Sequence, residues 1–163
     1  MLINRQTSPI YKLIISILIC ELTGVISGLL SNNGINTWFK TLNKPTWNPP
    51  AYLFGPVWAI LYLLMAISLW LVWKRFTPQK QKLSAIIIFA TQLFLNFWWS
   101  ILFFKLQSPF LAFIDILFML VFILITIYKF SAISKIAAWL LIPYFLWVSF
   151  ATFLNYTIWI LNK

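Results

Sequence analysis

The 163-residue chain is 63% hydrophobic and 20% aromatic, and only 9% of its residues are charged. A mean hydropathy of +0.93 excludes an ordinary soluble domain of this length and indicates an integral membrane protein. The formal net charge is +10, but the cations stand singly or in short clusters between apolar runs, which favours a membrane surface over nucleic acid as their partner.

Five apolar segments are long enough to cross a bilayer, because a spanning helix needs about 20 mainly apolar residues. Their hydrophobicity is continuous, which excludes the alternating pattern of a membrane β-barrel. The sequence therefore predicts an all-α fold, a single five-helix transmembrane domain in contact with the lipid bilayer. The expected helices cover residues 10–30, 52–73, 83–104, 110–128 and 136–161.

The first segment also has features of a secretory signal peptide, since Arg5 and Lys12 precede its apolar core. It is too long for a cleaved signal, and we expect it to be retained as the first helix. Gly24 and Gly28 have the small-xxx-small spacing that lets another helix approach closely.

The cations are distributed unequally between the two faces that five helices define. The N-terminus and the second and fourth loops carry Arg5, Lys12, Lys74, Arg75, Lys80, Lys82, Lys129 and Lys135, and the opposite face carries Lys40, Lys44, Lys105 and Lys163. The positive-inside rule therefore places the N-terminus in the cytoplasm and the loop of residues 31–51 outside.

That outer loop is rich in rigid residues. Pro45, Pro49 and Pro50 prevent helix formation, so we expect the loop to form a stiff lid around Trp47. Pro56 is expected in the first turn or so of the second helix, where a missing amide costs little.

Most conventional chemistry is excluded. The chain has no histidine and a single cysteine, Cys20, so histidine or cysteine metal clusters, catalytic triads and an internal disulfide are ruled out. The two acids, Glu21 and Asp115, fall within apolar segments, where an ionisable residue is a functional candidate. We favour structural roles for both, with Asp115 bonding neighbours near its helix end and Glu21 bonding a serine or threonine across an interface.

Three of the helices present aromatic and polar residues at helical spacing. Buried amides in a bilayer need hydrogen-bond partners, so the face with Gln92 and Asn96 must point inward. The alternatives are ordinary interhelical packing or a pocket for a flat, mostly apolar ligand. The residues concerned are Phe54, Trp58, Tyr62 and Met65 on the second helix, Gln92, Asn96, Trp99, Ser100 and Phe103 on the third, and Trp147, Ala151 and Leu154 on the fifth, which Pro143 bends.

A specific set of motifs covers nearly the whole chain. It includes Trp38-Phe39, the string Leu42-Asn-Lys-Pro-Thr-Trp-Asn-Pro-Pro50, Phe54-Gly-Pro-Val-Trp58, and the fifth-helix run Ala138-Trp-Leu-Leu-Ile-Pro-Tyr-Phe-Leu-Trp147. This set resembles the tryptophan-rich sensory protein family, whose animal members are the mitochondrial translocator proteins.

The resemblance implies a five-helix bundle, commonly a homodimer, with a ligand pocket under the first loop, here in a bacterial cell membrane. Family members bind porphyrins such as protoporphyrin IX, without metal ligation or a covalent bond, and isoquinoline or benzodiazepine ligands. Light-dependent breakdown of protoporphyrin in some bacterial members implies a photochemical role for Trp58, with Trp147 as its companion. The resemblance also implies that Asn96, Trp99, Ser100 and Ala151 line the pocket and that Phe39 and Phe54 close it.

A porphyrin needs stacking faces for its ring and cations for its propionates. Within the lid, which also holds Trp38 and Trp47, Lys40 and Lys44 are the expected propionate partners; alternatively, they mark a solvated loop. Three functional hypotheses follow: a receptor or sensor that binds tetrapyrroles, with or without their degradation in light, a transporter of porphyrins or similar molecules, and a scaffold that assembles through Gly24 and Gly28.

Overall fold

The computed structural model describes residues 9–163, so Arg5, which enters the charge count above, lies outside the described residues. The described chain is helical and contains no strand. Its elements are α1 (Pro9–Asn36), α2 (Trp38–Thr41), α3 (Ala51–Trp73), α4 (Gln79–Ser100), the π-helical η1 (Ile101–Lys105), α5 (Pro109–Ser131), α6 (Lys135–Leu140) and α7 (Ile142–Leu161).

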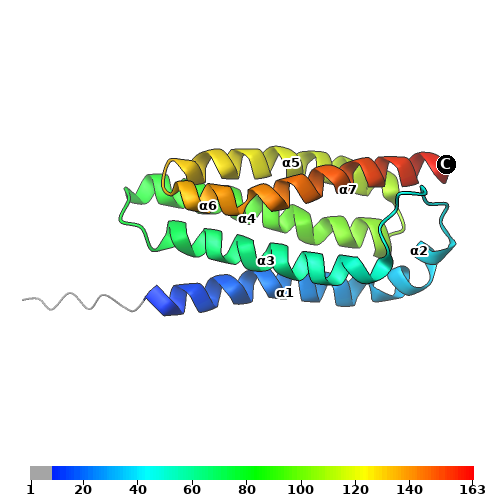
Figure 1. Cartoon of the computed structure of the whole chain (residues 1–163), viewed down its shortest axis with the longest axis horizontal. Coiled ribbons are helices and arrows are strands. Elements are labelled where there is room, and N and C mark those ends of the chain that lie inside the picture. Colours follow the sequence, from blue (N-terminus) through cyan, green and yellow to red (C-terminus); the bar gives the residue numbers. More distant parts are fainter. Residues whose placement is uncertain (1–8) are drawn as a thin grey trace, which may run out of the picture.

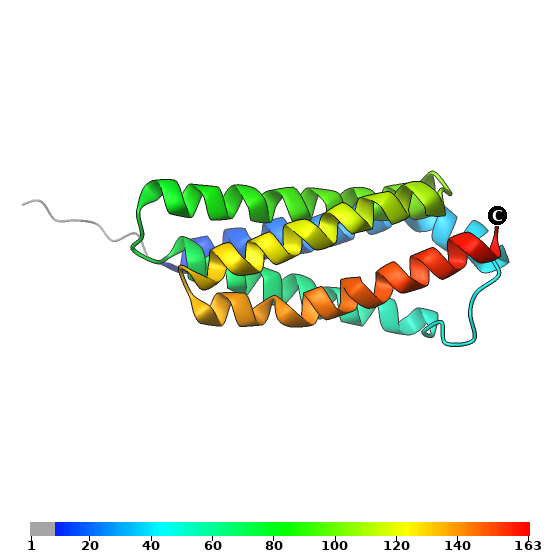
Figure 2. The same ribbon diagram turned by 90° about the horizontal axis from the view of Figure 1, so that it is seen from above.

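Five spans cross the length of the molecule, which confirms the predicted number. They are α1, α3, α4 with η1, α5, and α6 with α7, and each is long and apolar enough to traverse a bilayer. Figures 1 and 2 show them side by side as an up-and-down bundle, with α2 and the C-terminus at the same end. The chain is therefore a multi-pass membrane protein.

Local chemistry explains several boundaries. Ser108 caps α5, its Oγ accepting the Leu111 N–H at 3.4 Å, and Pro109 occupies the first turn, where its missing N–H costs nothing. Pro143 lies two residues after Leu141, where the fifth span breaks into α6 and α7, so the predicted bend is present.

Two expectations at the loop end need correction. The first helix continues to Asn36 rather than ending near residue 30, and the short helix α2 follows after one residue. The first part of the expected lid is therefore mostly helical, and its long irregular segment is residues 42–50. Pro56 is the sixth residue of α3, in its second turn, so it removes one α-helical hydrogen bond.

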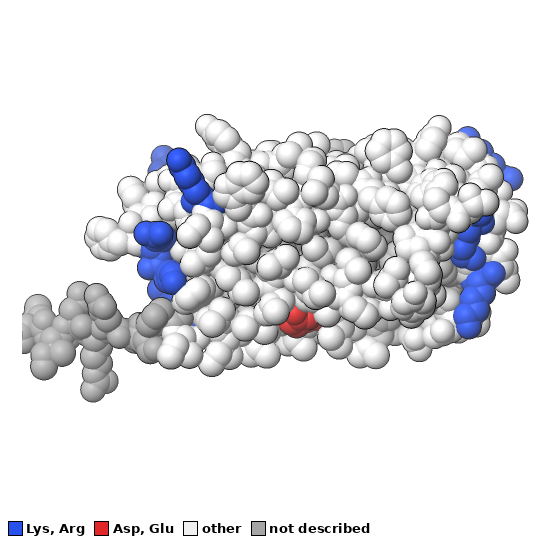
Figure 3. All heavy atoms as spheres, in the orientation of Figure 1, with Lys and Arg blue, Asp and Glu red and all other residues white. Residues whose placement is uncertain are grey.

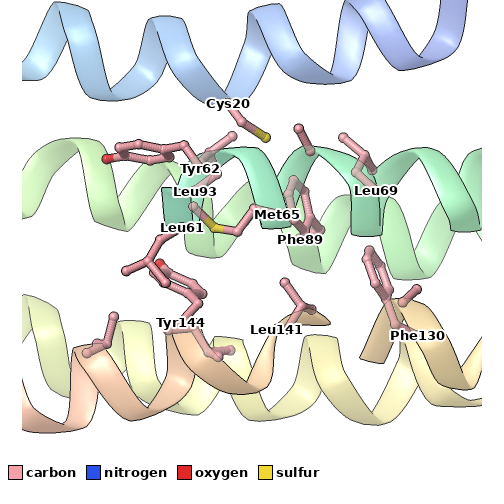
Figure 4. Packing of buried hydrophobic residues seen from close by; sticks show 14 of the residues in the cluster. Cys20, Leu61, Tyr62, Met65, Leu69, Phe89, Leu93, Phe130, Leu141 and Tyr144 are labelled. Carbon is pink, nitrogen blue, oxygen red and sulfur yellow. The ribbon is translucent and has the colours of Figure 1, made fainter. Parts of the chain in front are cut away.

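The core lies along the bundle axis between the five spans. Figure 4 shows Tyr62 and Met65 of α3 between Cys20 of α1 and Tyr144 of α7, and the Met65, Cys20 and Tyr144 side chains are fully buried. The large apolar side chains on the outer faces are exposed, as expected for surfaces that contact lipid. Basic residues gather at the two ends of the molecule (Figure 3).

Candidate ligand-binding site

A cavity of about 620 Å³ lies under the loop, between α1, α3 and the last turns of α4 with η1. Its walls contain seven of the predicted ligand-binding residues: Phe39, Phe54, Trp58, Tyr62, Asn96, Trp99 and Ser100. The volume is within the range of about 300–1,000 Å³ typical of small-molecule sites. The structure thus brings the predicted faces of α3 and α4 together around one space.

The α3 wall is built from residues one helical turn apart. Phe54, Trp58 and Tyr62 share one face, and the Trp58 and Tyr62 rings are 5.5 Å apart. Gly55 and Ala59, whose side chains are small or absent, also line this wall, and a Cβ placed on Gly55 would meet no atom within 4 Å. The α3 wall therefore combines aromatic rings with open space for a ligand.

The α4 wall is held by a hydrogen-bond network across three helices. Tyr62 Oη donates to Asn96 Oδ1, Asn96 Nδ2 donates to Tyr144 Oη at 3.1 Å, and Tyr144 Oη donates to Gln92 Oε1 at 2.8 Å. Gln92 and Asn96 are buried, as their positions in the sequence predicted. The network fixes Tyr62 at the cavity wall. It also gives the Gln92 and Asn96 side-chain amides hydrogen-bond partners, which lipid chains cannot provide.

Further along α4, two residues at the cavity are also held by hydrogen bonds. Trp99 Nε1 donates to Asn155 Oδ1 at 3.0 Å, which orients the indole against the cavity. Ser100 Oγ donates to Ser31 Oγ at 3.0 Å, and Ser31 Oγ donates to the Ser100 carbonyl at 3.1 Å. This pair joins α1 to α4 where the sequence predicted a loop.

The α1 wall was missed by the sequence analysis. Gly24, Val25 and Gly28 lie three, four and seven residues after Glu21, so all four residues share one face of α1, and all line the cavity. Gly24 packs so closely on the Tyr62 ring that a Cβ would overlap it, whereas a Cβ on Gly28 would meet nothing within 4 Å. The signal was available, because Glu21 shares a helical face with both glycines.

These contacts also bear on the scaffold hypothesis. Gly24 packs on Tyr62 of its own chain, and Gly28 faces the cavity. Assembly through the two glycines stays a prediction.

The loop end of the cavity carries the two predicted cations. Lys40 and Lys44 both line it, and Lys40 is exposed. Lys44 is bent back, with its Nζ donating to the Leu42 carbonyl at 3.1 Å and lying 4.7 Å from the centre of the Phe39 ring. Lys40 is therefore the more available partner for an anionic group.

The loop is fastened to the end of α7. Asn43 N–H donates to Asn162 Oδ1 at 2.9 Å, and Asn162 Nδ2 donates back to the Asn43 carbonyl at 2.9 Å. Trp47 packs edge-on against Phe150 at 5.8 Å, and Trp38 packs against Phe103 at 5.8 Å. Trp38 and Trp47 thus pack the lid against the bundle and do not line the large cavity.

The predicted residues of the fifth span lie in a separate space. Trp147, Ala151 and Leu154, together with Phe103, line a cleft of about 30 Å³. The rings of Phe39, Phe54, Trp58, Trp99 and Phe104 border both the cleft and the large cavity. In this structure the predicted pocket is divided into two adjoining spaces, because these aromatic side chains lie between α3 and α7.

The structural roles expected for the two acids are not seen among residues 9–163. Glu21 has no hydrogen bond there; the nearby Thr23 and Ser27 hydroxyls donate to carbonyls of their own helix at 2.7 and 3.1 Å. Asp115 is buried, and its Oδ2 has no hydrogen-bond partner. Both carboxylates are therefore unsatisfied by the part of the chain that the structure describes.

Residues 16–160 match the model of the TspO/MBR family. The chain belongs to this family. Among its relatives, the tryptophan-rich protein TspO of Chlorobaculum tepidum is 39% identical over 98% of this chain and 99% of its own length. The human translocator protein is 36% identical over 75% of this chain and 73% of its own, and the tryptophan-rich sensory protein of Cereibacter sphaeroides is 32% identical over 77% of each.

The range that matches the TspO/MBR family includes the three middle spans completely and most of the first and fifth spans. The matched range contains all the residues that line the large cavity. The cavity therefore belongs to the family domain itself rather than to an added segment.

Proposed function

We propose that this TspO/MBR protein is a membrane receptor that binds flat amphipathic ligands of the tetrapyrrole class, such as protoporphyrin IX, in the large cavity. The observation that carries the proposal is a space of about 620 Å³ walled by aromatic rings and bordered at its loop end by Lys40 and Lys44. Ring stacking favours a flat ligand by about 0.5–1.5 kcal/mol per pair beyond buried area. A cation at the mouth suits the carboxylates of such a ligand.

The depth of the cavity favours a receptor over a transporter. Its lining on α1 runs from Asn36 inward to Glu21, and on α3 from Ala51 to Tyr62. Apart from Glu21, which lies just before the middle of α1, neither helix contributes residues from the half that the charge distribution predicts to face the cytoplasm. A cavity that ends midway offers a binding site, whereas transport of a ligand across the membrane requires access to the site from both faces.

The homodimer remains a prediction.

A photochemical activity is the second part of the proposal. Trp58 borders the large cavity, while Trp147 lies on the far side of the aromatic wall. An excited porphyrin, or the oxygen species that it forms from O₂, would oxidise the adjacent Trp58 indole first, and breakdown of the porphyrin would follow. This chemistry needs no acid–base group, which suits a chain without histidine.

The test is a titration of the purified protein with protoporphyrin IX, followed by tryptophan fluorescence and then by porphyrin absorbance under illumination. We expect saturable quenching that weakens in Lys40→Ala and persists in Trp139→Phe, a control because Trp139 is 71% exposed on an outer face. We expect bleaching to be lost in Trp58→Phe while binding is retained.

The outcomes separate the two parts. Absence of saturable quenching overturns the receptor proposal. A porphyrin that binds but is stable in light overturns only the photochemical part, as does bleaching that survives Trp58→Phe.

A further inference from the structure

The large cavity has opposite charges at its two ends. Lys40 and Lys44 line the loop end, and Glu21 lines the inner end next to Tyr62. Helix α1 is continuous between Glu21 and Asn36, which both line the cavity. At 1.5 Å per residue, these 15 residues place the two ends about 22 Å apart along the helix.

Glu21 has no partner in the described chain that would neutralise or solvate its carboxylate. It forms no hydrogen bond or ion pair with residues 9–163, and the Tyr62 hydroxyl beside it already donates to Asn96. Figure 3 shows acidic atoms midway along the molecule, away from the basic residues at both ends. A carboxylate at this depth is costly unless something supplies a proton, a donor or a cation.

We infer that Glu21 is a specificity residue that recognises a cationic or N–H donor group at the inner end of the ligand. The favoured ligand is a flat aromatic molecule with a carboxylate at one end, near Lys40, and an amine or N–H group at the other. This inference rests on the proposed use of the cavity as a ligand site. It adds a preference that the aromatic walls supply only weakly, because a cation–π contact favours an ammonium by about 0.5–1 kcal/mol at exposed sites and the dehydration of the ammonium offsets that gain.

The geometry of the wall supports this assignment. Glu21 lies on the same face of α1 as Gly24 and Gly28, and neither glycine places a side chain between the carboxylate and the loop end. Thr23 does not line the cavity, and the Ser27 hydroxyl, which donates to the Gly24 carbonyl, offers only a neutral oxygen as an acceptor. Glu21 is thus the charged acceptor at the inner end of the cavity, and a cationic donor prefers it.

A matched pair of rigid probes tests the inference. 4″-(Aminomethyl)-p-terphenyl-4-carboxylic acid and 4″-ethyl-p-terphenyl-4-carboxylic acid have nearly the same shape, and only the first carries an ammonium opposite its carboxylate. Their affinities are measured by tryptophan quenching at pH 7. We expect the wild-type protein to bind the amine at least about tenfold more tightly, the scale of one charge-assisted hydrogen bond.

In Glu21→Gln the preference should fall to about one or below, because a neutral amide does not pair with the ammonium, while binding of the ethyl probe is retained. Asp115→Asn is the matched control, since it removes the other intramembrane carboxylate, which does not line the cavity. Gel filtration in detergent and helical circular dichroism establish that each variant is folded.

Equal wild-type affinities for the two probes, a preference that survives Glu21→Gln, or binding of neither probe would each overturn the inference. Protoporphyrin IX is titrated into the same samples. If protoporphyrin IX does not bind but the amine preference depends on Glu21, only the tetrapyrrole proposal is overturned. If protoporphyrin IX binds but the amine preference does not depend on Glu21, only the role of Glu21 is overturned.

Discussion

At the scale of single residues, the glycines of α1 differ in what their Cα atoms face. A Cβ on Gly34 would overlap the carbonyl oxygen of Phe104, so this glycine permits close packing of α1 on η1. A Cβ on Gly28 would enter open space in the cavity. One position is therefore required by the fold and the other by the volume of the site.

This difference predicts opposite effects for two substitutions. Gly34→Ala should lower the free energy of unfolding by about 1–3 kcal/mol, because backbone must shift to admit the methyl group. Gly28→Leu should leave thermal stability nearly unchanged and reduce the affinity for protoporphyrin IX at least about tenfold, because the side chain occupies the cavity. Thermal unfolding in detergent and fluorescence titration measure the two effects; a destabilised Gly28→Leu with normal binding would contradict the assignment.

A second residue-scale prediction concerns the polar network. Asn96→Leu removes the acceptor of Tyr62 and the donor to Tyr144 in a buried site, and should destabilise the protein by about 1–3 kcal/mol. Tyr62→Phe removes one hydroxyl and should cost less, near the average of about 0.6 kcal/mol for an interhelical bond in a membrane. Tyr128→Phe is the control, since Tyr128 is 77% exposed. Equal stability of Asn96→Leu and wild type would show that the network contributes nothing.

The residues that sequence reasoning found and those it missed differ in a physical way. Gln92 and Asn96 were identifiable because an amide in lipid must find a partner. Gly28 and Val25 carry no such requirement, and only their spacing relative to Glu21 pointed to the cavity. Trp147 lines the adjoining cleft rather than the large cavity, because the Phe54 and Trp58 rings pack between the two spaces, and residue spacing does not determine that packing.

At the scale of elements, helix ends were harder to predict than helix number. The length of an apolar run is set by bilayer thickness, so the spans were visible in the sequence. The extension of α1 to Asn36 was not, because Ser31-Asn-Asn-Gly34 has low helix propensity and is held by tertiary contacts. Those contacts are the Ser31–Ser100 pair and the close approach of Gly34 to Phe104.

The lid gives a prediction at this scale. Asn162 holds the loop by one accepted and one donated hydrogen bond to Asn43. Asn162→Ala should release the loop, so amide hydrogen exchange of residues 42–50 should accelerate while exchange in α3 stays unchanged. Asn162→Asp retains the acceptor and loses the donor, so its exchange should be intermediate. Unchanged exchange in Asn162→Ala would mean that the Trp47 and Trp38 contacts suffice to hold the lid.

At the scale of the whole molecule, charge and hydropathy together determine how the bundle lies in a membrane. The described cations divide between the ends of the bundle as the sequence analysis counted them, seven at the end where α1 begins and four at the loop end. The larger group contains Lys12, Lys74, Arg75, Lys80, Lys82, Lys129 and Lys135. The positive-inside rule predicts that this end faces the cytoplasm, an orientation that would place the cavity in the outer half of the bilayer.

Single-cysteine labelling tests this orientation. Cys20 is fully buried and is first replaced in Cys20→Ala. Thr46→Cys then places a thiol on the loop above the cavity, and Thr77→Cys places one in the connection between α3 and α4 at the opposite end. In intact bacterial cells a membrane-impermeant maleimide should label the Thr46 position directly and the Thr77 position only after permeabilisation. The reverse pattern would invert the orientation and place the cavity, with Lys40 at its mouth, on the cytoplasmic side.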